Sequence, residues 1–412
     1  MKVIKTGLIL TSLAIVCVGF IGMARKQSFP VAPPYSGLPN GEFPLRASYA
    51  LYQPFINRQQ FEWVKEAGFN CIRQTLDYRD MDSLMTLAPE FGLYVTAAMP
   101  DVRDSLKITR VVDRYRSNPY FWGLSVVDEP SMDKFVDVRN QIRRLDTSDP
   151  AQNPFANLLP AVGSKQMGAP DYRTYVEEFV RIVNPPYISY DAYPIRFDKD
   201  GRITVWKDYF FTLETIADVA AKSKRPFWGY ILTNKHWSYP KPTREFLRYQ
   251  IFTNLAYGAQ GLSYFTYLHP DYDNKGEYSD SPIDRQGRRT DTWYAVRDVN
   301  REVKNLEKVF LGSTVEEIRH TGKIPRGTKR LGRLPRPFRN IESLGAEGVV
   351  VSRLKNGKER YLILVNKDVV NSQDVRIGLS GDIVRLTGDG KESPFSAQTV
   401  TLTPGGYAIF RY

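Results

Sequence analysis

The stretch FWGLSVVDEPS, Phe121 to Ser131, is an apolar run that ends on two adjacent carboxylates and a proline. Alternation along a strand places small residues and Glu129 on one face, and bulky residues with Trp122 and Asp128 on the other. This pattern predicts a parallel barrel strand whose bulky face packs on outer helices and whose final carboxylate reaches a site. In the alternative interpretation, Asp128 or Ser131 caps a helix beginning near Met132, and Glu129 is a solvated loop acid.

The flanking sequence repeats the same alternation of a strand-like run and a helix-like run. Eight such units fill roughly 270 residues, which is the arithmetic of a (β/α)8 TIM barrel over residues 44–312. The expected strands are 45–51, 69–76, 93–99, 121–127, 155–161, 187–193, 227–232 and 261–267. The expected helices are 58–67, 81–91, 106–116, 134–145, 172–183, 209–221, 244–257 and 292–309. An open doubly wound sheet would have fewer strands and usually a glycine-rich phosphate turn after the first, and neither feature is present.

The pattern changes near Ser313 to short alternating strands separated by Gly, Asn and Asp turns. Strands are expected at 348–353, 360–365, 375–379, 383–386, 399–402 and 406–411. The sequence therefore predicts a small all-β sandwich domain, 313–412, that packs on the barrel and mainly stabilises it.

Composition narrows the class of protein. With 412 residues, 42% hydrophobic and 25% charged, the chain is long enough for one large and one smaller globular domain. The net charge is +12, but basic and acidic residues are interspersed, so we expect a solvated surface and no nucleic-acid partner. No P-loop or dinucleotide glycine motif and no close His/Cys cluster occurs, so neither a cofactor nor a metal is expected.

The first 24 residues predict export. Lys2 and Lys5 precede an apolar run that ends in Gly22-Met23-Ala24, as in a signal peptide, and a linker, 25–43, follows. Because the run approaches the length of a membrane span, an uncleaved membrane anchor is the alternative. We expect a periplasmic or secreted protein. Its oligomeric state is not readable from the sequence.

Polar and aromatic residues gather where the predicted barrel strands end, which is where barrel active sites lie. Aromatic faces stack on the C–H patches of sugar rings, while carboxylates and amides bind hydroxyl groups and two acids cleave the glycosidic bond. The sequence thus predicts a carbohydrate substrate. Glu129 is a candidate for one of the two acids, and the expected substrate-binding residues are Arg73, Asp128, Tyr193, Tyr230, Asn234, Trp237, Tyr264 and Glu277.

The segment NPYFWGLSVVDEPS resembles the fourth-strand signature of the β-galactosidase-like (β/α)8 glycoside hydrolases of the large retaining clan. The segments GFNCIR (68–73), YDAYP (190–194), YGAQG (257–261), DRQGRRT (284–290) and LTPGGYA (402–408) are similar to further parts of the same clan. The resemblance implies that Glu129 is the general acid/base and that residues 45–412 form the barrel with its β-domain.

Two departures from the clan concern the catalytic residues. The clan usually has Asn before the acid/base, where this chain has Asp128, and its nucleophile is a glutamate that ends strand seven. Here the corresponding run, FWGYILTNKH (227–236), contains no carboxylate. We expect Asp191 to be the second catalytic acid, acting as base or nucleophile, with Glu277 as the next candidate. The predicted activity is glycoside hydrolysis, and the alternative is a non-catalytic carbohydrate-binding protein on a decayed hydrolase barrel.

Overall fold

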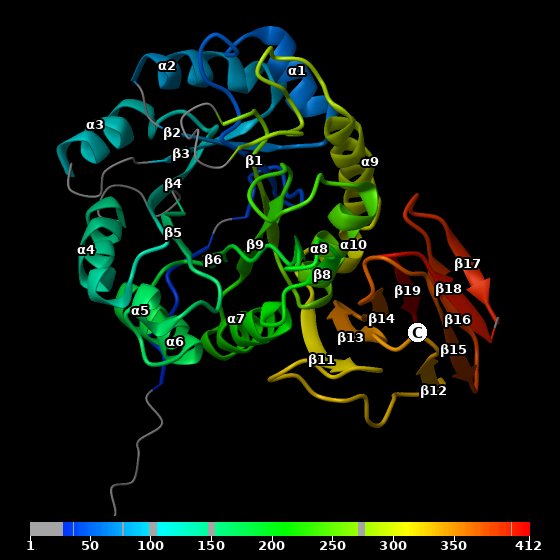
Figure 1. Cartoon of the computed structure of the whole chain (residues 1–412). Coiled ribbons are helices and arrows are strands. Elements are labelled where there is room, and N and C mark those ends of the chain that lie inside the picture. The colour runs from blue at the N-terminus through cyan, green and yellow to red at the C-terminus, as the bar shows by residue number, and fades with distance from the viewer. Residues whose placement is uncertain are drawn as a thin grey trace, which may run out of the picture.

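The computed structural model describes residues 28–35, 37–75, 78–98, 105–146, 153–270, 277–396 and 398–412. Among these residues, eight parallel strands close a barrel in the order β1-β10-β9-β6-β5-β4-β3-β2. Figure 1 shows the barrel beside the carboxyl-terminal β-structure. The barrel strands are β1 (Leu45–Ser48), β2 (Cys71–Thr75), β3 (Tyr94–Ala98), β4 (Phe121–Asp128), β5 (Phe155–Leu158), β6 (Ile188–Tyr190), β9 (Phe227–Leu232) and β10 (Gly261–Phe265). The predicted fold class, a TIM barrel followed by an all-β unit, is confirmed.

The longer helices of the described ranges surround the barrel (Figure 1). They are α1 (Arg58–Glu66), α2 (Tyr78–Leu87), α3 (Ser105–Tyr115), α4 (Phe135–Asp146), α6 (Tyr172–Val183), α7 (Tyr209–Ser223), α8 (Arg244–Ala256) and α9 (Asp291–Asn305). Short helical turns are η1 (Ala88–Phe91), η2 (Met132–Lys134), α5 (Ser164–Met167) and α10 (Glu307–Phe310). In the described part of the chain, no helix combines the length and apolar character needed to span a membrane.

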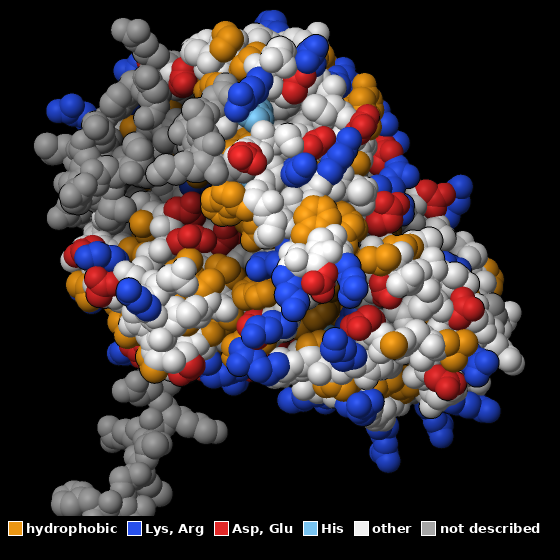
Figure 2. All heavy atoms as spheres, in the orientation of Figure 1, with side chains coloured by type: hydrophobic (Ala, Val, Ile, Leu, Met, Phe, Trp, Pro, Cys, Tyr) orange, Lys and Arg blue, Asp and Glu red, His pale blue; other side chains and the backbone are white. Residues whose placement is uncertain are grey.

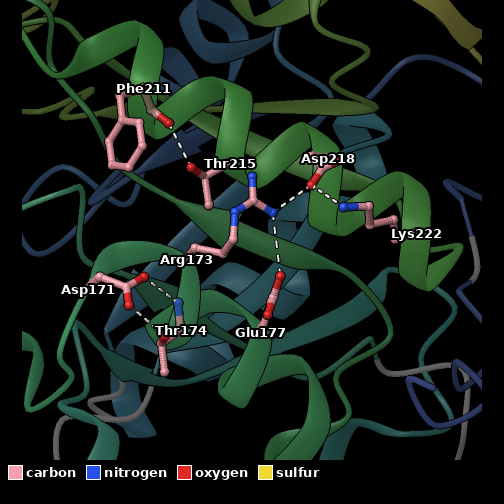
Figure 3. Close-up of polar contacts among 8 residues, drawn as sticks. All are labelled: Asp171, Arg173, Thr174, Glu177, Phe211, Thr215, Asp218 and Lys222. Atoms are coloured by element: carbon pink, nitrogen blue, oxygen red, sulfur yellow. Dashed lines mark hydrogen bonds and ion pairs between the residues drawn. The ribbon is translucent and has the colours of Figure 1, made fainter. Parts of the chain in front are cut away.

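Helices α6 and α7 show how the outer layer is held together. Asp171 caps α6, because its carboxylate accepts hydrogen bonds from the Thr174 backbone N–H (2.9 Å) and hydroxyl (2.7 Å). Arg173 of α6 donates to Asp218 of α7 at 2.6 Å, and Lys222 shares the same carboxylate at 2.7 Å (Figure 3). Ion pairs between side chains therefore connect the two helices on their solvent side, while apolar residues of α6, such as Tyr175 and Phe179, are buried inside.

An aromatic cluster that includes Trp122 fills the amino-terminal end of the barrel. The prediction that Trp122 packs on the outer helices is therefore wrong. That side chain does not face the outer helices: it stacks on Trp228 of β9, with ring centroids 5.5 Å apart, and its indole N–H donates to the Gly37 carbonyl. The physical reason is a register shift against β3, where Val95 pairs with Phe121 and Thr96 with Gly123. Trp122 is the extra residue, so strict alternation fails there.

The carboxyl-terminal unit contains two antiparallel sheets. The first has the order β11-β13-β14-β19-β16-β17 and the second the order β12-β15-β18. Their strands are β11 (Thr314–His320), β12 (Phe338–Ser343), β13 (Val349–Asn356), β14 (Glu359–Asn366), β15 (Gln373–Leu379), β16 (Ile383–Leu386), β17 (Glu392–Phe395), β18 (Thr399–Leu402) and β19 (Tyr407–Arg411). Strands β11, β12 and β17 were not expected from the sequence.

The central strands β13, β14 and β19 of the six-stranded sheet are buried on both faces, which joins the sandwich to the barrel. Leu362 and Leu364 face the sandwich interior, whereas their neighbours Tyr361 and Ile363 belong to the core shared with the barrel helices. The Ser352 hydroxyl donates to the Ala256 carbonyl at the end of α8 at 2.5 Å. Because both faces of this sheet are apolar, we expect the two units to unfold together.

Candidate active site

A pocket of about 260 Å³ lies at the carboxyl ends of the barrel strands. Figure 2 shows a hollow over the barrel where acidic and hydrophobic side chains meet. The lining contains three carboxylates, two arginines and many aromatic rings, so the pocket has the composition of a sugar site. Its described residues are Tyr49, Arg73, Asp128, Glu129, Asn157, Pro160, Asp191, Tyr193, Arg196, Trp206, Tyr230, His236, Trp237, Tyr239, Phe265 and Tyr278.

The end of β4 is held in an unusual backbone conformation. Glu129 has a φ of 48°, which non-glycine residues rarely adopt and which costs about 1–3 kcal/mol. Two contacts secure it: the Glu129 N–H donates to the Asn157 carbonyl (2.8 Å), and the Tyr175 hydroxyl donates to the Pro130 carbonyl (2.6 Å). The conformation brings Glu129 and its neighbour Asp128 to the same pocket, where alternation alone would separate them.

Asp128 is positioned by side chains from β5 and β6. The Asn157 amide donates to the Asp128 carboxylate at 3.2 Å, and the Ser189 hydroxyl donates to the carbonyl oxygen of the same amide at 2.9 Å. Ser131, the alternative helix cap, bonds Asp133 and provides no side-chain cap to η2. The interpretation of this stretch as a capping turn is therefore not supported by the contacts.

Glu129 and Asp191 form the central contact of the pocket, because their carboxyl groups hydrogen-bond to each other. Burial raises the pKa of Asp191 well above its ordinary range, and the negative charges of Glu129 and Asp128 raise it further. Burial also raises the pKa of Glu129, as does Asp128, while the hydrogen bond with Asp191 partly lowers it. The surrounding protein therefore raises the pKa of Glu129 even though its side chain is open to the pocket.

This contact requires a shared proton, since two carboxylates would only repel each other. The Asp191 Oδ1 atom is buried and has no hydrogen-bond donor among the described residues. The pair consequently holds one proton to a higher pH than an isolated carboxyl group, and its pKa values belong to the pair.

Direct contact also bears on the role expected for Asp191. Catalytic carboxyls lie about 5–5.5 Å apart in retaining glycosidases and about 6.5–9.5 Å apart in inverting ones. A hydrogen-bonded pair leaves no room between the carboxyl groups for the anomeric centre or a water molecule that these spacings accommodate. Asp191 as base or nucleophile therefore stays a prediction that this spacing does not favour, whereas a proton-sharing role follows directly from the contact.

Arg73, at the barrel floor below the carboxylates, is buried and donates to the Ser125 hydroxyl at 3.1 Å. Its guanidinium lies 4.9 Å from the centroid of the Tyr49 ring and interacts electrostatically with Asp128. The positive charge of Arg73 is thus offset by Asp128 within the same pocket.

Three of the expected aromatic residues line the pocket. Tyr193 stacks on Phe265, with centroids 6.2 Å apart, and Tyr230 lies on β9 with 5% of its surface exposed. Trp237 is 68% exposed and has a φ of 45°. A large, exposed indole at the edge of a pocket is unusual for a structural residue and suits stacking on a ligand ring.

Three other expected binding residues lie elsewhere. Asn234 is fully buried, and its carbonyl oxygen lies 2.7 Å from Nδ1 of His236, so it orients a pocket residue without lining the pocket. Tyr264 is a correction: it is fully buried and donates to Asn300 of α9, because alternation turns Ser263 and Phe265 toward the barrel interior. Glu277 is exposed and does not line the pocket. Asp77 and Asp101, which follow the second and third expected strands, and Asp271 and Asp273, in the loop after the eighth, fall outside the described residues.

Other pocket residues were not identified from the sequence as binding residues. Arg196 and Trp206 come from a hairpin, β7 (Ile195–Phe197) with β8 (Ile203–Val205), inserted between β6 and α7. The Asp200-Gly201 turn between two short alternating runs is the signal that predicts such a hairpin. Tyr49, Asn157, Tyr239, Phe265 and Tyr278 lie on separate loops and strands, and no sequence motif connects them.

Two further observations concern where other ligands would bind. Within the described ranges, no group of three or more His, Cys, Asp or Glu side chains has the arrangement of a metal site. A larger cavity, about 910 Å³, lies beside Pro44, Phe227 and Gln260, at the amino-terminal ends of the strands. That end of a TIM barrel contributes to stability, whereas catalysis takes place at the opposite end.

Comparisons with protein-family models and with curated proteins find no match for this chain. Solved structures do match. A β-galactosidase from Bacillus circulans sp. alkalophilus has a TM-score of 0.60 at 9% identity, with 90% of this chain and 99% of that chain covered. A GH42 β-galactosidase from G. stearothermophilus has a TM-score of 0.60 at 10% identity, with 93% and 99% covered.

A β-galactosidase from the psychrophilic Marinomonas ef1 has a TM-score of 0.50 at 11% identity. The alignment covers 64% of this chain and 60% of that enzyme, which is less than two thirds of its length. At such identities the likeness concerns the fold alone. The chain shares with these β-galactosidases the architecture of a closed eight-stranded barrel followed by β-structure.

Proposed function

We propose that this protein is a glycoside hydrolase in which Glu129, sharing a proton with Asp191, protonates the glycosidic oxygen of the bound sugar. The observation that carries the proposal is the carboxyl–carboxyl contact at the carboxyl ends of the barrel strands, within an aromatic pocket. A proton held on such a pair to a higher pH than on an isolated carboxyl group is what general acid catalysis of glycoside cleavage needs.

The surrounding residues suit the same chemistry. Tyr193, Tyr230 and Trp237 provide aromatic surface for pyranose rings, and Asp128, held by Asn157, provides an acceptor for a sugar hydroxyl. Glu129, as the more exposed of the pair, is the proposed donor to the leaving oxygen. Asp191 and Glu277 are the proposed candidates for the second acid.

The test incubates wild-type protein and the Glu129→Gln variant with a broad panel of glycans. Hydrolysis is measured as the release of reducing ends. We expect Glu129→Gln to lower kcat by about 10²–10⁴-fold while sugar binding persists, because the amide keeps the shape of the side chain but cannot donate the proton. Hydrolysis at a near wild-type rate by this variant would show that Glu129 is not the acid.

The second acid can be assigned by chemical rescue. If Glu277 is the nucleophile, Glu277→Ala should lose activity and regain it in azide, with an azido sugar as the product. If Asp191 only shares the proton, Asp191→Ala should show no azide product. Product stereochemistry then reports whether the reaction is retaining or inverting.

A non-catalytic carbohydrate-binding protein is the second proposed function. The observation that favours it is the sequence after β9, Thr233-Asn234-Lys235, which has no carboxylate where related barrels have their nucleophile. This function predicts sugar binding by calorimetry with no reducing-end release on the same panel. For either function we propose export through residues 1–24, which mass spectrometry of the secreted or periplasmic protein would test.

A further inference from the structure

The β7–β8 hairpin places one arginine, Arg196, at the pocket wall. The Trp206 N–H donates to the Pro194 carbonyl (2.6 Å), which closes the base of the hairpin, and the Phe197 N–H donates to the Ser238 carbonyl (2.7 Å), which fastens β7 to a neighbouring loop. At the tip, the Asp198 carboxylate accepts from the N–H groups of Asp200 and Arg202 at 2.9 Å each. Arg196 therefore projects from a rigid element.

The Arg196 guanidinium lies between two aromatic rings. Its central carbon is 5.1 Å from the centroid of Trp206 and 5.4 Å from that of Tyr239. Its one hydrogen bond within the described part of the chain goes from Nη2 to the Tyr193 carbonyl at 3.4 Å, which is long and weak. The Nε atom is buried and has no partner there.

Arg196 forms no ion pair with a carboxylate in the described part of the chain. A half-buried guanidinium without a counter-ion is costly, because its hydration is reduced and nothing replaces it. Aromatic stacking holds the planar group in place and leaves N–H donors for a ligand, an arrangement suited to bidentate binding of an anion.

We propose that Arg196 binds an anionic substituent of the glycan, either the carboxylate of a uronic acid or a sulfate ester, so that the substrates are acidic glycans. The inference rests on the proposed function, since it concerns the sugar bound in the same pocket. The carboxylates of the pocket do not prevent this, because Arg73 offsets Asp128, and the shared proton leaves a single negative charge on Glu129 and Asp191.

The experiment compares matched oligosaccharides that differ only in charge. Galactan is tested beside galacturonan and sulfated galactan, and glucan beside glucuronan and sulfated glucan, by calorimetry at pH 7 with the full chain. The proteins are wild type, Arg196→Gln, Arg196→Lys and a control, Arg202→Gln. Arg202 lies on the same hairpin and is exposed outside the pocket, so its variant makes the same charge change away from the site.

We expect at least one acidic oligosaccharide to bind wild type ten times more tightly than its neutral counterpart. Arg196→Gln should lower that acidic affinity at least tenfold and change the neutral affinity less than twofold. Arg196→Lys should retain part of the affinity, since lysine keeps the charge but not the planar fork. Arg202→Gln should leave both unchanged. Binding of the uronic-acid oligosaccharides would identify the anionic group as a carboxylate, and binding of the sulfated ones would identify it as a sulfate ester.

Any of three results would overturn the inference. Wild type could bind no acidic oligosaccharide, or it could bind neutral and acidic oligosaccharides with equal affinity. Arg196→Gln could also lower the affinity for neutral and acidic oligosaccharides by the same factor. Reducing-end release is measured separately, which keeps the two proposals distinct. Acidic binding through Arg196 without cleavage would refute hydrolysis alone. Cleavage of neutral glycans unaffected by Arg196→Gln would refute the acidic-glycan inference alone.

Discussion

The carboxyl group of Glu129, immediately after β4, hydrogen-bonds the carboxyl group of Asp191, immediately after β6. Strand β5 lies between these two strands, and its Asn157 contacts both Asp128 and the backbone of Glu129. Three neighbouring strands thus build the acidic side of the pocket, while the aromatic side chains Tyr230 and Trp237 come from β9 and the loop after it.

Asp191→Asn should shift the pH dependence of catalysis. Loss of the last proton from the wild-type pair leaves two negative charges in contact, which keeps the pKa of this step high. In the variant, ionised Glu129 faces a neutral amide that donates a hydrogen bond, so the alkaline limb of the kcat/KM profile should move to lower pH. Kinetics from pH 4 to 9 measures this, and an unchanged alkaline limb would show that no proton is shared.

Trp237→Ala should weaken sugar binding and leave the fold intact. The indole is largely exposed, so its removal changes few packing contacts. Stacking of this kind contributes about 0.5–1.5 kcal/mol, which corresponds to a Kd about 2- to 12-fold higher. Calorimetry with a bound oligosaccharide measures the loss. Tyr294→Ala, another exposed aromatic but on α9 outside the pocket, serves as the control and should bind normally.

His320→Gln should make the protein more resistant to acid. His320 is fully buried where β11 meets the barrel, with Nε2 2.9 Å from the Tyr257 hydroxyl, and burial, followed by the charge of Lys367, lowers the pKa of His320 to about 3. The unfolded state takes up a proton below its pKa of about 6.5, so the histidine lowers stability as pH falls from 6.5 toward 3.

The size of this effect is about 2 kcal/mol between pH 7 and pH 5, at about 1.4 kcal/mol per pH unit below 6.5. Glutamine retains a polar partner for Tyr257 and does not titrate. Urea unfolding at pH 7 and pH 5 tests the expectation. A variant that loses as much stability as wild type over this interval would exclude His320 as the source.

Gly229→Ala should destabilise the barrel. A Cβ atom at this position in β9 would lie 2.1 Å from Oδ1 of Asn254, which accepts a hydrogen bond from the Tyr190 hydroxyl. Overpacking of this kind costs about 1–3 kcal/mol, and thermal unfolding should show a lower Tm. At Gly332 a Cβ atom would meet nothing within 4 Å, so Gly332→Ala should leave Tm nearly unchanged. Equal Tm values for the two variants would contradict the packing argument.

The fold was largely readable from the sequence because it depends on repeated local patterns. Helix α6 (Tyr172–Val183) and strand β9 (Phe227–Leu232) begin and end where hydrophobic periodicity predicted. Strands β11, β12 and β17 were missed. Strand β11 comes before a basic loop rich in proline and glycine, and β12 begins where that loop ends. Strand β17, ESPF, contains a proline, which argues against a strand.

The sequence by itself determined that Glu129 ends a barrel strand, because the order of strands and helices specifies which end of the barrel its side chain occupies. Only the tertiary structure decided what Glu129 touches. A positive φ at Glu129, a register shift at Trp122 and the inserted hairpin with Arg196 each alter the direction of a side chain without altering the hydrophobic pattern. Periodicity reports burial over many residues, whereas catalytic contacts depend on the orientation of single residues from distant segments.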